Sequence, residues 1–326
     1  MRILITGGAG FIGSHLTDSL LQAGHEVTIF DNLSTGNIRN LNQALKNDNC
    51  RIIQGDILDG YQVKKSLEDI DYCFHFAAAV GVDLILKNPI VSMRTNVHGS
   101  ENVMQEACDL GVPVLFASTS EIYGKNSAEL LHEDSDRIIG SPTLWRWSYS
   151  DAKALDEALA TALAKMYNFQ VKTIRYFNTV GPRQSEFYGM VIPNFVKAAI
   201  FGRDLKIYGD GSQRRVFCHI EDAIDGTLSL WRQPTGFGEV FNLGGLEEIS
   251  ILELAKMVIQ ITNSSSQIEF IPYEQLRKSG YEDIPRRRPN IEKISSAANW
   301  RPVRGINQII VDYVNYYLES NNAKHL

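Results

Sequence analysis

The chain has 326 residues, of which 44% are hydrophobic and 21% charged, and its formal net charge is −6. This apolar fraction excludes an intrinsically disordered chain, and the acidic balance argues against a protein held on nucleic acid by a basic surface. No apolar run reaches the roughly 18 residues that a membrane helix needs. The first residues lead into a glycine cluster rather than a secretion signal. The four cysteines have no paired spacing, so we expect a cytoplasmic protein without a metal site.

The first half of the chain alternates short apolar β-rich runs with amphipathic helical patterns. The predicted strands are Arg2–Thr6, Glu26–Phe30, Cys50–Gln54, Tyr72–Phe76, Val112–Ser118 and Val171–Tyr176. The predicted helices are Ile12–Ala23, Tyr61–Leu67, Ile90–Leu110 and Tyr149–Tyr167. This alternation predicts the α/β class with a Rossmann-type, doubly wound parallel sheet.

The regular alternation ends after about Gly181, where Pro, Gly and Arg interrupt the pattern. We therefore expect a first domain over residues 1–180 and a smaller α/β domain over residues 181–326. Residues 216–246 are expected to return to the first domain, because Glu221–Leu230 predicts a helix and Val240–Leu243 a further strand.

A glycine triplet, Thr6-Gly7-Gly8-Ala9-Gly10-Phe11-Ile12-Gly13, separates the first predicted strand from the first predicted helix. Gly7 permits a tight turn, Gly10 lets the backbone approach a pyrophosphate, and Gly13 permits close packing of helix on strand. The helix N-terminus that follows offers N–H groups and a positive dipole end to an anion. A strand-to-helix turn without a ligand is the alternative interpretation.

Carboxylates and small residues follow the next predicted strands. Asp31 lies about 20 residues after the glycines, where an acid can bind the hydroxyls of an adenosine ribose. The same charge would repel a 2′-phosphate, which favours NAD over NADP; a capping role is the alternative. Asp56 and Ile57 are expected to lie beside the adenine, and Ala77-Ala78-Ala79 lets a dinucleotide approach the strand ends.

Tyr149 and Lys153 are spaced i, i+4 in a predicted helix, so their side chains share one helix face. An ammonium stabilises phenolate over phenol, so we expect Lys153 to lower the Tyr149 pKa from about 10 toward working pH. Tyr149 is then a candidate general base for a sugar hydroxyl. The upstream run Ser118-Thr119-Ser120-Glu121 offers a hydroxyl to the same oxygen. A solvated helix face is the alternative.

Together with further motifs, these signals resemble the extended short-chain dehydrogenases/reductases that modify nucleotide sugars. That family contains UDP-sugar epimerases, 4,6-dehydratases and UDP-glucuronate decarboxylases, and the resemblance covers essentially the whole chain. The further motifs are Phe74–Ala78, Thr95–Gly99, Ser120–Gly124, Arg175–Arg183, Tyr208–Gly211 and Arg215–Ile220.

The resemblance implies a role for each matching position. The implied catalytic residues are Thr119, Tyr149, Lys153 and Glu121. The implied NAD contacts are Gly7, Gly10, Phe11, Ile12, Gly13, Asp31, Asn32, Asp56, Ile57, Ala77, Ala78, Asn96, Tyr149 and Lys153. The implied substrate is a UDP-linked nucleotide sugar. Its implied contacts are Thr119, Asn178, Val191, Leu205, Tyr208, Arg215 and Arg287. Residues 1–180 would then bind NAD, and residues 181–326 mainly the substrate.

Guanidinium groups suit a diphosphate, which agrees with the roles implied for Arg215 and Arg287. Surface ion pairs are favoured for Arg183, Arg214, Arg286 and Arg288, and structural roles for His75 and His219.

Members of this family share a first step that oxidises the sugar at C4, and they differ in the fate of the 4-keto sugar. Rereduction on the other face gives a C4 epimer, loss of a C6 carboxylate gives a decarboxylase, and elimination of water gives a dehydratase. Glu121 is typical of decarboxylases and dehydratases, whereas Ser120 replaces an acid of the dehydratases. Ser141–Ser148 resembles an Arg-Trp segment that occurs in a bacterial oxidative decarboxylase and also in a group of epimerase-like proteins. Asn178–Val180 and Tyr188–Val191 fit the epimerase-like group more closely than the decarboxylase.

On this balance the sequence narrowly favours an NAD-dependent C4 epimerase of a UDP-hexose, with UDP-glucuronate decarboxylase or 4,6-dehydratase as the alternative. A non-catalytic NAD-binding protein and an oxidoreductase that releases NADH stay open. Asn290 replaces an acid common in the Arg-Arg-x-Pro-Asp segment of the family. Ile90–Leu110 and Tyr149–Tyr167 resemble helices of a four-helix dimer interface, so we expect a homodimer with no nucleic-acid or membrane partner.

Overall fold

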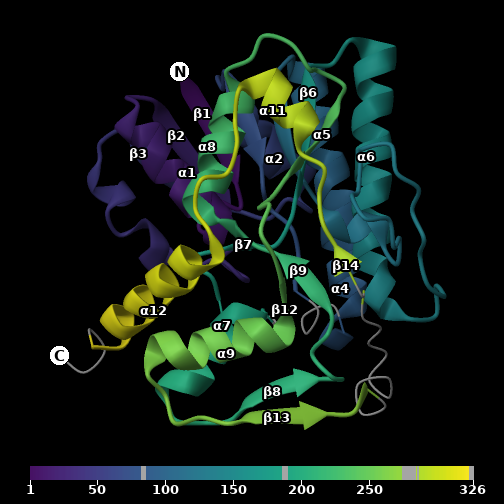
Figure 1. Cartoon of the computed structure of the whole chain (residues 1–326). Coiled ribbons are helices and arrows are strands. Elements are labelled where there is room, and N and C mark those ends of the chain that lie inside the picture. Colours follow the sequence, from purple (N-terminus) through teal and green to yellow (C-terminus); the bar gives the residue numbers. More distant parts are fainter. Residues whose placement is uncertain (82–85, 186–189, 274–283, 285, 323–326) are drawn as a thin grey trace.

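The computed structural model describes residues 1–81, 86–185, 190–273, 284 and 286–322, and it follows the predicted alternation of strands and helices (Figure 1). The elements of the first half are β1 (Arg2–Thr6), α1 (Phe11–Gln22), β2 (Glu26–Asp31), β3 (Cys50–Gln54), α2 (Gly60–Leu67), β4 (Tyr72–His75), α4 (Pro89–Arg94), α5 (Ser100–Leu110), β5 (Val114–Thr119), α6 (Ser148–Tyr167) and β6 (Val171–Tyr176). Short 3-10 turns cover Ile38–Leu41, Ala44–Lys46, Ser120–Tyr123 and Trp145–Trp147.

The second half contains shorter strands between its helices. Its elements are β7 (Thr179–Val180), α7 (Val191–Ile200), β8 (Leu205–Tyr208), β9 (Arg214–Val216), β10 (Cys218–His219), α8 (Ile220–Trp231), β11 (Val240–Leu243), β12 (Glu248–Ser250), α9 (Ile251–Thr262), β13 (Ile268–Ile271), β14 (Arg286–Arg287), α11 (Glu292–Ala298) and α12 (Ile306–Asn322).

The main sheet has the strand order β11-β6-β5-β4-β1-β2-β3, and every neighbouring pair is parallel. The order reverses between β1 and β4, and in doubly wound folds the crevice beyond the carboxyl ends at such a point binds the ligand. The predicted α/β, Rossmann-type fold is therefore confirmed.

Alternate residues of each strand pack against opposite layers of helices. Ile3 and Ile5 of β1 lie in a core with α1, α8 and α11, whereas Leu4 lies in a second core with α2, α5 and α6. Successive side chains of a strand point to opposite faces, so strands covered on both faces are apolar throughout. Figure 1 shows the sheet between these two layers.

The predicted helix Ile90–Leu110 is not one regular helix. A π-helical turn at Thr95–Gly99 separates α4 from α5. Gly99 packs so closely on Ile57 that a Cβ there would lie 2.4 Å from the Ile57 Cδ1 atom. Hydrophobic periodicity does not report such a local widening of a helix.

A separate apolar core lies in the second half, below the main sheet in Figure 1. It joins α7, α9 and α12 with the parallel pair β8 and β13. Strand β11 joins the main sheet beside β6, and α8 packs on α1. Ile291, Ile294 and Trp300, in and around α11, also pack in the α1 core, a second return that the sequence did not predict.

Candidate active site

The predicted site residues gather at the carboxyl edge of the main sheet. Thr6, Asp31, His75 and Thr119 are the last residues of β1, β2, β4 and β5. Because these strands are parallel, the loops that follow them open on the same edge.

The glycine turn is shaped for an anion. Gly7 has a φ of +72°, which favours glycine, and a Cβ there would lie 2.7 Å from the backbone nitrogen of Ala77. Gly10 is the N-cap of α1, and Phe11 and Ile12 form its half-buried first turn. Among the described residues, no side chain caps the N–H groups of this turn, and it contains no acidic residue. The cradle and the open helix end fit the pyrophosphate of NAD.

Gly13→Ala should disrupt this turn, because a Cβ at Gly13 would lie 2.4 Å from the carbonyl oxygen of Gly7. We expect the free energy of unfolding to fall by about 1–3 kcal/mol and NAD to bind about tenfold more weakly or worse. Thermal unfolding and calorimetric titration measure the two effects. Gly60→Ala is the matched control, since a Cβ at Gly60 meets only Asn102, at 3.8 Å. Equal losses in both variants would contradict the steric argument.

Asp31 ties the glycine turn to the end of β2. Its Oδ2 accepts a hydrogen bond from the Ala9 backbone at 2.9 Å, and its Oδ1 accepts one from Leu33 at 2.8 Å. Burial raises the pKa of the carboxyl, and these two N–H groups oppose that rise. Each carboxylate oxygen keeps a lone pair, so Asp31 can both hold the loop and bind ribose hydroxyls.

The loops after β2 and β3 are joined to each other. The Asn32 amide donates to Oδ2 of Asp56 at 3.1 Å, and Oδ1 of Asp56 accepts from the backbone of Leu58 at 2.9 Å. The Ile57 side chain is buried beneath Gly99. Asn32 and Asp56 thus lie side by side at the edge where the adenine is predicted.

The loop after β4 is held by Asn96, from the π-helical turn. The Asn96 side chain accepts from the Ala79 backbone nitrogen at 2.7 Å and donates to the Ala79 oxygen at 3.0 Å. The Ala77 nitrogen donates to Oγ1 of Thr6 at 3.3 Å. Asn96 therefore shapes the Ala77–Ala79 loop, and its direct contact with NAD stays a prediction.

Thr119 and Tyr149 come together as predicted, and Lys153 lies about one turn further along α6. Tyr149 and Lys153 lie in the first turns of α6, both buried, and the Tyr149 hydroxyl is hydrogen-bonded to the Thr119 side chain. Thr119 ends β5, where its Oγ1 also accepts from the backbone nitrogen of Glu121 at 3.1 Å. A substrate hydroxyl placed at this pair would meet both side-chain oxygens.

The predicted effect of Lys153 on Tyr149 is wrong for this structure. Burial raises the Tyr149 pKa, and the carboxylates of Glu121 and Asp156 raise it further. Helix spacing identified Lys153 as a neighbour, but it did not reveal these two carboxylates. Tyr149 can therefore act as a base only where a positive charge beside it stabilises the phenolate.

Glu121 lies between two guanidinium groups. Its Oε2 lies 2.5 Å from Nη2 of Arg146, and its Oε1 accepts a hydrogen bond from Nη1 of Arg287. Burial alone raises the Glu121 pKa, but the two cations outweigh burial and hold the pKa well below its ordinary value. Two positive charges and one negative charge leave this trio with a net charge of about +1 beside Tyr149.

The sequence drew attention to Arg146 only as part of Ser141–Ser148 and did not predict it as a site residue. It lies in the turn Trp145–Trp147, is 5% exposed, and its guanidinium stacks on Trp147 at 5.1 Å. Its position three residues before Tyr149 was the available signal, because a turn leading into α6 faces the same crevice as the start of that helix.

The predicted substrate residues are distributed between the site and a core. Asn178 donates to the Val216 carbonyl at 2.8 Å and accepts from Arg287 at 3.1 Å, so it adjoins the Glu121 trio. Val191 is half-buried at the start of α7, and Tyr208 is exposed at the end of β8. Leu205 is fully buried in the α7 and α9 core, so it can offer substrate only its backbone.

Four arginines of the neighbouring strands β9 and β14 lie in pairs on opposite faces of these strands. In the parallel pair β9 and β14, Arg214 is the register partner of Arg286, and Arg215 that of Arg287. Arg214 and Arg286 both pair with Glu248, at 3.2 and 2.6 Å. Arg215 and Arg287 point to the opposite face, since successive side chains of a strand alternate.

Arg183, His219 and His75 have the structural roles that the sequence favoured. Arg183 pairs with Asp18 at 2.6 Å. Nδ1 of His219 accepts from the Glu221 backbone and caps α8, and Nδ1 of the buried His75 lies 2.7 Å from Oγ1 of Thr6.

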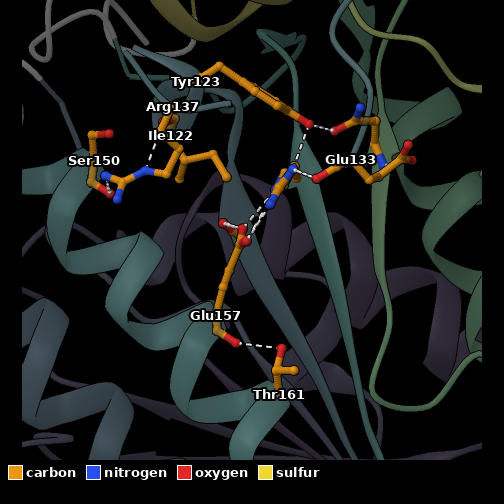
Figure 2. Close-up of polar contacts among 10 residues, drawn as sticks. Ile122, Tyr123, Glu133, Arg137, Ser150, Glu157 and Thr161 are labelled. Atoms are coloured by element: carbon orange, nitrogen blue, oxygen red, sulfur yellow. Dashed lines mark hydrogen bonds and ion pairs between the residues drawn. The ribbon is translucent and has the colours of Figure 1, made fainter. Parts of the chain in front are cut away.

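A buried polar network fixes α6 against the sheet beneath the site (Figure 2). Arg175 of β6 bonds both carboxylate oxygens of Glu157, the Tyr123 hydroxyl at 2.7 Å and the Glu133 carbonyl at 2.8 Å. Tyr123 in turn donates to Asn242 of β11 at 2.7 Å. Figure 2 shows Glu157 reaching from α6 toward the Tyr123 and Glu133 side of this network. The helix that carries Tyr149 is thus bonded to two strands.

The family model described as "NAD dependent epimerase/dehydratase family" matches residues 3–244. The chain belongs to this family. It is 38% identical over 322 residues to the UDP-N-acetyl-alpha-D-glucosaminuronate decarboxylase of Bacillus cytotoxicus, covering 98% of this chain and 99% of that one. It is 36% identical over 313 residues to UDP-glucuronic acid decarboxylase 1 of Danio rerio, covering 95% of this chain and 72% of the relative.

Solved structures of this epimerase/dehydratase family share the fold. The UDP-glucuronic acid 4-epimerase of Bacillus cereus, in complex with UDP-glucuronic acid and NAD, superposes with a TM-score of 0.89 at 28% identity, covering 98% of this chain and 100% of that one. The chain is accordingly an NAD-dependent enzyme, and the glycine turn is where its cofactor fits. In the part of the chain that the structure describes, no helix is long and apolar enough to cross a membrane.

Proposed function

We propose that the enzyme decarboxylates a UDP-linked uronic acid, such as UDP-N-acetylglucosaminuronate or UDP-glucuronate. The observation that carries the proposal is the surplus positive charge of the Glu121, Arg146 and Arg287 trio beside Tyr149. The sugar ring is expected beside Tyr149, and a neutral hexose offers no anion at that place, whereas a C6 carboxylate does. The decarboxylases among the relatives support this choice over the C4 epimerisation that the sequence narrowly favoured, for which we find no confirmation.

The side chains have distinct tasks in this reaction. Tyr149 takes the proton of the sugar 4-hydroxyl, and Thr119 holds that oxygen. When bound, NAD supplies an acceptor, and later a donor, for the hydride at C4. Once C4 is a ketone, the C6 carboxylate is β to it. The electrons of the C5–C6 bond can then move to the ketone oxygen, and carbon dioxide leaves. Water protonates C5 of the enolate, which restores the C4 ketone. When the hydride returns to C4, Tyr149 gives the C4 oxygen the proton that it removed at the start.

Product mass tests the proposal. Purified enzyme is incubated separately with UDP-N-acetylglucosaminuronate and UDP-glucuronate, and with UDP-glucose and UDP-N-acetylglucosamine as controls without a carboxylate. We expect at least one uronate to lose the mass of carbon dioxide, with no product from the controls. An isobaric product from any of the four would instead identify an epimerase, and turnover of no uronate would overturn the proposal.

C4 epimerisation of the same uronate is the second candidate, favoured by the solved UDP-glucuronic acid 4-epimerase. The two reactions share every step up to the 4-keto acid. Retention of the carboxylate, seen in the product mass, separates them. A dehydratase has less support, because Ser120 is buried and offers a hydroxyl where an acid is needed.

We further propose a cytoplasmic homodimer. Ile90 and Val91 of α4 and Leu155 of α6 are large apolar side chains that are 64%, 61% and 57% exposed, and α4 contacts α6. Exposed apolar residues gathered on adjacent helices are typical of a surface covered by a partner. Light scattering that reports the monomer mass would contradict the dimer.

A further inference from the structure

Lys153 is one of the most buried ammonium groups of the described chain. Its side chain is 3% exposed, and its Nζ lies 4.4 Å from the centre of the Phe116 ring on β5. Burial lowers the Lys153 pKa, because a buried ammonium loses its hydration. Without a neighbouring negative charge, this lysine would tend to lose its proton.

One carboxylate lies next to it. Oδ2 of Asp156 is 3.7 Å from Nζ of Lys153, and the Asp156 side chain is 2% exposed. The two residues are spaced i, i+3 on α6, which places them on one face of the helix. Burial raises the Asp156 pKa to about 6, and Lys153 opposes that rise. An ionised Asp156 in turn favours the ammonium form of Lys153.

Glu157, also on α6, raises the Lys153 pKa less than Asp156 does. It bonds Arg175 through both carboxylate oxygens and accepts from the Ser118 hydroxyl. On β4, His75 faces Lys153, but burial and the ammonium hold its pKa well below the ordinary value, so it is neutral. From α5, the neutral Ser100 hydroxyl faces Asp156.

We propose that Asp156 is the positioning counter-ion of Lys153, holding its buried ammonium charged at the base of the Tyr149 site. Asp156 touches no reacting atom in this role and acts only through the lysine. The inference rests on the proposed roles of Tyr149 and Lys153 for its catalytic consequence. It does not depend on whether the 4-keto sugar is decarboxylated or epimerised.

The direct test is an NMR titration of Lys153 in the cofactor-free protein. Labelling lysine with carbon-13 at Cε reports its protonation, and Lys153→Arg identifies the signal by its loss. In Asp156→Asn we expect the Lys153 pKa to fall by about 1 to 3 pH units. Asp156→Glu should restore it at least in part.

Asp151→Asn is the matched control. Asp151 lies on the same helix but is half exposed and pairs with Arg137 at 2.8 Å, so its loss should leave the Lys153 titration unchanged. A Lys153 pKa that is equal in wild type and Asp156→Asn would overturn the proposal. Should Asp156→Asn not fold, the reciprocal variant Lys153→Met should raise the Asp156 pKa above about 6, and an unchanged Asp156 titration would overturn it equally.

The pH dependence of the reaction rate tests the counter-ion role of Asp156 separately from the proposed function of the enzyme. If Lys153 must be charged, the alkaline limb of the pH–rate profile should move to lower pH in Asp156→Asn by the same interval as the Lys153 titration. A shifted titration with an unshifted profile supports the counter-ion and contradicts the proposed role of Lys153. An unshifted titration contradicts the counter-ion whatever the activity.

Discussion

Tyr149→Phe should lower turnover of the uronate substrate by about 10²- to 10⁴-fold, the usual contribution of a positioned general base. The change removes one oxygen and leaves the buried ring in place, so α6 should keep its packing. NAD should bind nearly as tightly as in wild type, because the glycine turn and Asp31 lie on other elements. Steady-state rates and calorimetric titration with NAD give the two readouts.

Tyr167→Phe is the control for Tyr149→Phe. Tyr167 ends the same helix and is 64% exposed, so loss of its hydroxyl should leave turnover unchanged. Wild-type turnover in Tyr149→Phe would exclude Tyr149 as the base. Loss of NAD binding together with turnover would show that the variant damages the cofactor site instead.

Glu121→Gln should destabilise the protein by about 3–5 kcal/mol, because it leaves the buried guanidinium groups of Arg146 and Arg287 without their common anion. Chemical denaturation at neutral pH measures this loss. Glu68→Gln is the control, since Glu68 pairs with Lys65 at an exposed site and should contribute little. We also expect turnover to fall, because two unpaired cations would repel each other and shift the site.

The stability that Glu121 contributes should fall at acidic pH. Arg146 and Arg287 hold the folded-state pKa of Glu121 below its ordinary value of 4.5, against the effect of burial. The stability that ionised Glu121 contributes is therefore fully present above pH 4.5, and it is lost as the pH falls through the folded-state pKa. The difference in unfolding free energy between wild type and Glu121→Gln should therefore become smaller as the pH is lowered below 4.5. A constant difference down to low pH would mean that Glu121 is not the titrating group.

Local patterns predicted the elements that carry the site. The predicted strands of the main sheet agree with the structure to within about two residues, since buried parallel strands are short, apolar and separated by amphipathic helices. The glycine turn, Tyr149 and Lys153 were also recognisable, because their chemistry depends on spacing within a few residues.

Contacts between distant segments were not recognisable in this way. Arg287 meets Glu121 across 166 positions of the chain, and no periodicity links them. The wrong direction for the Tyr149 pKa has the same origin, because it depends on burial and on a carboxylate from the loop after β5. The burial of Leu205 likewise follows from how α7 and α9 pack around β8.

The pairing of β9 with β14 makes the site sensitive to the insertion or deletion of a residue in β14. One face of this ribbon directs Arg214 and Arg286 to Glu248, and the other carries Arg215 and Arg287 toward the Glu121 side. Side chains alternate along a strand, so inserting or deleting one residue within β14 would exchange the two faces of that strand. A change in the length of β14 by a single residue would therefore misplace Arg287 and remove Arg286 from Glu248 at once.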